Sequence, residues 1–132
     1  MRRLGILTLA LVLGACGADD GRDEGDAATF CARLDRLTEN DPFLAFGDTA
    51  TADEVAQAFE ALVDRAAELT AVAPPEARVA ARDYAESAGA LDALLAGAGY
   101  DGTAVDSRAY RDEQLAYAEA SRLLVRYLDS EC

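Results

Sequence analysis

The feature that most constrains the fold is a helical periodicity of apolar side chains in three long segments. The clearest segment begins at Thr51, whose hydroxyl forms a capping-box pattern with Glu54. It ends at Pro74-Pro75, because an interior proline breaks a helix. Equivalent patterns cover residues 75–96 and 107–129. Three amphipathic helices joined by short breaks predict an all-α domain.

A fourth helical segment, shorter than the others, begins near Thr29 and fades at Asn40-Asp41-Pro42. Its apolar side chains, Phe30, Leu34 and Leu37, fall on one helical face. Together the four segments predict an antiparallel four-helix bundle with a short first helix. A three-helix core with a docked N-terminal segment is the competing architecture.

The connection after the short helix carries three large apolar side chains, Phe43, Leu44 and Phe46. They either plug one end of the core or form an exposed binding patch. Large exposed apolar patches are uncommon on soluble proteins, so we interpret these residues as a plug.

The N-terminus has the three-part pattern of a secretory signal, with basic Arg2 and Arg3 ahead of the apolar run Leu4–Leu13. A run of about ten apolar residues is too short to span a membrane, which needs about 20. The run closes with Leu13, Gly14, Ala15 and Cys16, which resemble the lipobox of bacterial lipoproteins.

The lipobox resemblance implies that a signal peptidase cuts before Cys16 and that the Cys16 thiol carries a diacylglyceryl group. Leu13, Gly14 and Ala15 would then form the peptidase recognition site. The alternative is an ordinary cleaved signal that leaves Cys16 as a plain thiol. With the early Phe30-Cys31-Ala32, the Pro-Pro break and the terminal cysteine, the whole chain resembles small helical lipoproteins of actinobacterial type.

These patterns divide the chain into residues 1–15, a lipoprotein signal peptide, residues 16–28, a lipidated cysteine with a disordered leash, and residues 29–132, the bundle. The leash is rich in Gly and Asp and has no bulky apolar side chain to bury. Its acidic residues match no calcium-loop spacing, so we interpret them as a solvated spacer rather than a cation site.

The formal charge of the whole chain is −13, with 12 arginines as its basic residues against 25 acidic ones. Loss of residues 1–15 removes two arginines and would leave a charge of −15. A domain this acidic is a poor partner for nucleic acid, so no nucleic-acid binding is predicted.

Two further cysteines stand at the ends of the predicted bundle, Cys31 in the short helix and Cys132 at the last residue. Those ends meet in an antiparallel four-helix arrangement, and an exported domain folds under oxidising conditions. We therefore predict a Cys31–Cys132 disulfide. A free thiol or an intermolecular bridge are the alternatives, whereas a metal site is remote because no histidine or further cysteine completes it.

No catalytic signature stands out. The chain has no histidine and no lysine, so its serines have neither residue as a base that could activate them. Its acidic residues that are adjacent in sequence point in different directions on a helix, so they do not form a catalytic pair. We therefore predict a protein that is not an enzyme and that has neither a metal nor a cofactor.

The best candidate for a binding site is a group of aromatic and basic residues on the last helix, which suit an interface: Tyr110, Tyr117, Tyr127, Arg122 and Arg126. The competing interpretation is structural, with half-buried tyrosines and arginines paired to nearby acids.

The expected function is that of a membrane-tethered extracytoplasmic lipoprotein, a non-enzymatic interaction or accessory module at the cell envelope. Its expected partners are the membrane, through the lipid on Cys16, and an envelope protein. The anchoring membrane would be the cell membrane, or the outer membrane in a two-membrane cell. The alternative is a small-ligand-binding domain with a groove between the helices at 75–96 and 107–129.

Overall fold

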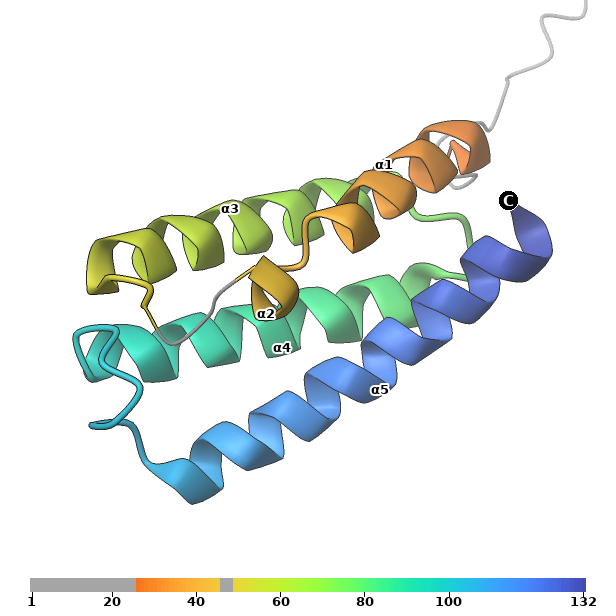
Figure 1. Cartoon of the computed structure of the whole chain (residues 1–132). Helices are drawn as coiled ribbons and strands as arrows, with labels where there is room; N and C mark the ends of the chain where they lie inside the picture. The colour runs from red at the N-terminus through yellow and green to blue at the C-terminus, as the bar shows by residue number, and fades with distance from the viewer. Residues whose placement is uncertain (1–25, 46–48) are drawn as a thin grey trace, which may run out of the picture.

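The computed structural model describes residues 26–45 and 49–132 and is all-helical in that part of the chain. The signal peptide, Cys16 and residues 17–25 of the leash lie outside the described residues, as does Phe46. The five helices are drawn in Figure 1 and have the bounds α1 Ala27–Glu39, α2 Pro42–Ala45, α3 Ala52–Ala71, α4 Arg78–Gly97 and α5 Ser107–Glu131. The predicted all-α bundle is confirmed, with α2 as an added single turn.

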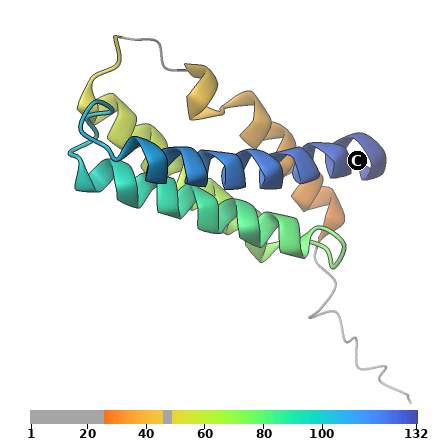
Figure 2. The same ribbon diagram turned by 90° about the horizontal axis from the view of Figure 1, so that it is seen from below.

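The four longer helices form an antiparallel ring of neighbours. α4 packs on α3 and α5, and α1 packs on α3 and α5 from the other side. The direction of the chain alternates from α1 to α3, α4 and α5, as Figures 1 and 2 show. The start of α1 and the end of α5 therefore lie at the same end of the bundle. This is the arrangement that short connections between amphipathic helices favour.

The helix ends follow local capping chemistry, and the starts of α1 and α4 differ from the predicted bounds. α3 begins with the predicted capping box, in which the Thr51 backbone N–H donates to Glu54 at 2.8 Å. α1 starts at Ala27 rather than near Thr29, because the Asp26 carboxylate accepts from the Thr29 backbone N–H at 3.2 Å. The predicted leash is therefore shorter at its C-terminal end.

α4 begins at Arg78, three residues later than predicted. Residues 75–77 form a turn instead, in which the Ala77 N–H donates to the Pro74 carbonyl at 3.0 Å. At the other end α4 ends at Gly97, and Gly99 then adopts a left-handed φ of +63°. Gly99 thus lets the chain turn away directly after α4, because glycine enters this region without steric cost.

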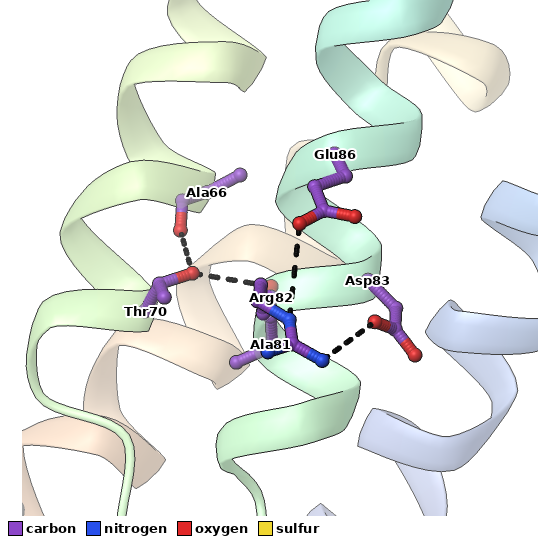
Figure 3. A network of polar contacts seen from close by, with 6 residues as sticks. All are labelled: Ala66, Thr70, Ala81, Arg82, Asp83 and Glu86. Atoms are coloured by element: carbon purple, nitrogen blue, oxygen red, sulfur yellow. Dashed lines mark hydrogen bonds and ion pairs between the residues drawn. The ribbon is translucent and has the colours of Figure 1, made fainter.

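The core is built from the apolar stripes of all four longer helices. Its largest fully buried side chains are Tyr84, Phe30, Leu34, Leu62, Leu69, Leu91 and Leu124. Small residues let α3 and α4 approach closely, and the Thr70 hydroxyl lies 2.9 Å from the Ala66 carbonyl and 3.1 Å from the Ala81 carbonyl (Figure 3). Arg82, drawn beside this contact, reaches Asp83 and Glu86 only at 3.8 Å on an exposed surface, where such pairs contribute little.

Cys31 and Cys132 lie at disulfide-bonding distance, with 1.98 Å between the sulfurs and 5.7 Å between the Cα atoms. The predicted pairing is thus confirmed. It joins α1 to the C-terminal end of α5, where the rings of Phe30 and Tyr127 also pack in a T-shaped arrangement. α1 is therefore held to α5 at one end of the bundle.

Candidate functional site

The candidate site arises from a mismatch of helix lengths. α1 has 13 residues and α5 has 25, so at 1.5 Å per residue they are about 20 Å and about 38 Å long. α1 starts beside the C-terminal end of α5 and ends part of the way along the bundle (Figure 1). The N-terminal half of α5 therefore lacks a full-length neighbour on this side.

One side of α5 consists of exposed residues that include two large apolar side chains. We define the α5 outer face as Arg111, Leu115, Ala118, Arg122, Val125 and Asp129, all of which are exposed. Leu115 is 64% exposed and Val125 is 38% exposed. A third exposed apolar residue of α5, Leu123, is 39% exposed and lies toward α4 instead, so only part of the apolar excess of this helix falls on the α5 outer face.

A groove runs between the α5 outer face and the residues at the start of α2. Its volume is about 690 Å³, and its lining includes Leu115 and Val125 from α5 with Asp41 and Phe43 opposite. The hollows on the α4 side of α5, where the ligand groove was expected, are smaller, at about 450 and 390 Å³. Acidic residues line the larger of these two, among them Asp83 and Glu119.

Phe43 and Tyr117 close the inner wall of the groove. The Phe43 ring contacts the rings of Phe59 and Tyr117, with centroid separations of 5.5 Å and 5.1 Å. Phe43 therefore serves as the predicted plug. The side chains of Leu44 and Phe46 lie outside the described residues, so the plug interpretation extends to Phe43 alone.

Behind this wall, two tyrosines share a buried hydrogen bond. The Tyr84 and Tyr117 hydroxyls are 2.6 Å apart, and both rings are almost fully buried. Burial raises the pKa of Tyr117 to about 12 and raises the pKa of Tyr84 further. One hydroxyl donates to the other, so each buried oxygen has a hydrogen-bond partner. Both side chains stay neutral near pH 7 because burial holds their protons, so neither serves as a general base there.

This pair predicts a loss of stability at alkaline pH. In the unfolded chain tyrosine ionises near pH 10, whereas the folded state holds these two protons to higher pH. The free energy of unfolding should be insensitive to the pair below about pH 9 and should fall from about pH 10 to about pH 12, by about 1.4 kcal/mol per pH unit for each tyrosine. The chain has no lysine, so no lysine titration obscures this range. Urea unfolding at several pH values measures the slope.

Tyr84→Phe is the matched variant for this experiment, because it removes one of the two protons and keeps the ring. Its slope above pH 10 should be smaller than that of the wild type. Equal slopes would contradict the assignment of the alkaline transition to this pair.

The predicted tyrosine and arginine group does not form a single surface. Tyr117 is only 5% exposed, so its assignment to an interface is corrected: it lies in the core. Tyr110 and Tyr127 are half-buried, and Tyr127 packs against Phe30. Arg122 and Arg126 are exposed, and Arg122 forms an ion pair with Glu119, with 3.0 Å between Nε and Oε2. The tyrosines therefore fit the competing interpretation, in which they have a structural role in the bundle. The two arginines are exposed on the surface.

Sequence reasoning did not single out Leu115, Val125 or Asp129 as site residues. Leu115 and Val125 widen the apolar surface of α5 beyond one stripe, a pattern that indicates either a central helix or an interface. The sequence alone does not distinguish the two, because it does not show where the short helix stops covering α5.

Residues 26–45 and 49–132 contain no group of three or more His, Cys, Asp or Glu side chains that could hold a metal ion. In the same ranges no helix combines the length and apolarity needed to cross a membrane. Comparisons with protein-family models, curated proteins and solved structures found no match. Chemically, the α5 outer face offers exposed apolar side chains flanked by arginines.

Proposed function

We propose that this protein is a lipid-anchored extracytoplasmic interaction module that presents the α5 outer face to a partner at the cell envelope. The observation that carries the proposal is the exposure of Leu115 and Val125 on one face of a well-packed bundle. Exposed large apolar side chains that share one helical face are typical of protein–protein contact sites. The lipobox resemblance of Leu13, Gly14, Ala15 and Cys16 supports the anchor.

The charges beside the apolar residues support a protein partner over an apolar surface such as the membrane interior. Arg111 and Arg122 border Leu115, and the domain around them is acidic. Arginine is enriched at protein interfaces, where it makes directional hydrogen bonds, and the exposed leucine and valine beside it supply apolar contact area.

The anchor is tested by the intact mass of protein extracted from membranes. The wild type should begin at Cys16 and carry the mass of acyl chains, and Cys16→Ser should carry none. The double variant Cys31→Ser/Cys132→Ser is the matched control, because it removes two cysteines and keeps Cys16, so it should retain the acyl mass. An unacylated wild type would refute the anchor and leave the interaction surface to be tested separately.

The interaction surface is tested by photo-cross-linking in cells, with a photoreactive side chain at position 115 or at position 79. Leu115 and Val79 are similarly exposed, at 64% and 59%, but Val79 lies on α4, away from the α5 outer face. We expect defined adducts from position 115 and none from position 79. The same weak labelling at both positions would contradict the proposal.

A second candidate function is supported by the size of the groove. A volume of about 690 Å³ falls within the range of small-ligand sites, and its walls are mainly apolar with Arg111 and Arg122 beside them. The ligand chemistry that fits is an apolar body with an anionic group. A saturable thermal shift with such amphiphiles, lost in Leu115→Asp and kept in Val79→Asp, would favour this candidate over a protein partner.

A further inference from the structure

The α5 outer face has the spacing of a coiled-coil seam. Its six residues, at positions 111, 115, 118, 122, 125 and 129, alternate intervals of four and three residues. This is the a and d spacing that brings side chains into line along a helix that pairs with another helix. All six are exposed, and they lie on a different face from the buried residues of α5, which are Tyr117, Ala120 and Leu124. α5 therefore has two seams, one turned toward its own core and one toward solvent.

The outer seam is complementary to itself in the antiparallel direction. A two-fold axis at the level of residue 120 brings together positions equally far on either side of it. Arg111 then faces Asp129 of a second copy, Leu115 faces Val125, and Ala118 faces Arg122. Opposite charges meet at both ends, apolar side chains meet next to them, and the small Ala118 leaves room for the long Arg122 side chain. These are the a-to-d layers of an antiparallel helix pair.

We propose that the α5 outer face binds the same face of a second copy of this chain, with the two α5 helices antiparallel. A two-fold interface of this kind uses one surface on both subunits, so each favourable contact occurs twice. The inference rests on the proposed role of this face as an interaction surface and names its partner. It does not depend on the lipid anchor.

The flanking residues support the same register. The positions beside the seam bring Asp112 of one copy toward Arg126 of the other, which adds an opposite-charge pair at each end. Near the axis, Arg122 is already paired with Glu119 of its own helix. The Arg122 guanidinium at the centre of the seam is therefore neutralised within its own helix. The two Glu119 side chains also approach each other there, and Arg122 offsets part of their repulsion.

A parallel pairing of the same face would place identical residues opposite each other. Arg111 would face Arg111, Arg122 would face Arg122, and Asp129 would face Asp129. Like charges across a seam are destabilising, and three such layers oppose the parallel arrangement. Charge complementarity thus specifies both the occupant of the seam and its direction.

A charge exchange across the seam tests the proposal in the full-length protein extracted from membranes. Arg111→Asp places two aspartates opposite each other at both ends, and Asp129→Arg does the same with two arginines. Each single variant should weaken self-association by about tenfold or more, because each converts two attractive contacts into repulsive ones. The double variant Arg111→Asp/Asp129→Arg restores opposite charges and should return the dissociation constant to within about threefold of the wild type, measured by sedimentation equilibrium at low salt.

Neither substitution is expected to disturb the folding of the domain. Both residues are exposed, and neither forms an ion pair with another described residue at 4.0 Å or less. Circular dichroism melts should therefore be close to that of the wild type. Leu115→Asp should also abolish association, while Val79→Asp, the matched change on α4, should leave it intact.

Direction is tested by disulfide trapping between two preparations, one with Arg111→Cys and one with Asp129→Cys. The antiparallel pairing predicts linked heterodimers in the mixture and none from either preparation alone. A wild type that stays monomeric at all concentrations would overturn the inference, as would a double variant as weak as the singles, or links between identical positions. If position 115 instead cross-links to a different envelope protein in cells while the chain stays monomeric, the inference fails and the proposed function stands.

Discussion

Loss of the Cys31–Cys132 bond is expected to lower the free energy of unfolding by about 2–5 kcal/mol, because the bond closes a long loop and restricts the unfolded chain. The two residues are 101 positions apart in sequence. Small domains have a total stability of about 5–15 kcal/mol, so this loss is a large fraction of it. Urea unfolding of the Cys31→Ser/Cys132→Ser variant against the oxidised wild type measures the difference.

Reductant provides the control for this experiment. The wild type should lose its extra stability when dithiothreitol is added, whereas the double variant should unfold at the same urea concentration with and without it. The double variant is preferred to either single one, since a lone remaining thiol could link two chains. A wild-type midpoint that does not move on reduction would contradict a stabilising role for the bond.

Phe30→Ala is expected to destabilise the domain by about 3–5 kcal/mol, the usual cost of removing a large aromatic side chain from a core. Phe30 is fully buried, and its ring forms a T-shaped contact with Tyr127 at 5.4 Å between the centroids. It anchors α1, the shortest of the four bundle helices, to the end of α5. Chemical denaturation measures the loss, and hydrogen exchange of the α1 amides should show where it falls.

Val79→Ala is the matched control for Phe30→Ala. Val79 is a 59% exposed apolar residue on α4, so its truncation should change stability by no more than about 0.5 kcal/mol. A comparable effect of the two substitutions would mean that α1 is not docked through Phe30.

Much of the local structure could be predicted from the residues. The capping box at Thr51 and the glycines after residue 96 set helix ends through interactions within a few residues, which the sequence displays directly. The first residue of α4 was harder to predict from the sequence. Pro75 suits the first turn of a helix, yet residues 75–77 form a separate turn before Arg78, and both conformations satisfy the same local preferences.

The surface could be predicted only in part. The excess of apolar residues on α5 was visible in the sequence, and so was the tyrosine group. Tyr117 was assigned to an interface because tyrosine combines contact area with hydrogen bonding, and the same two properties also suit a core position with a polar partner. Its burial depends on the Tyr84 hydroxyl, which a different helix brings to within 2.6 Å. No local pattern encodes that meeting of two side chains.

Residue order was enough to predict amphipathic helices in an antiparallel bundle and to favour the Cys31–Cys132 pairing over its alternatives, because helical periodicity, capping and short connections are local features. Which apolar residues of α5 are core and which remain outside follows only from the packing of the helices. That division depends on how far the 13-residue α1 extends along the 25-residue α5. Coverage by a neighbouring helix is a property of packing, and packing alone leaves Leu115 and Val125 exposed to solvent.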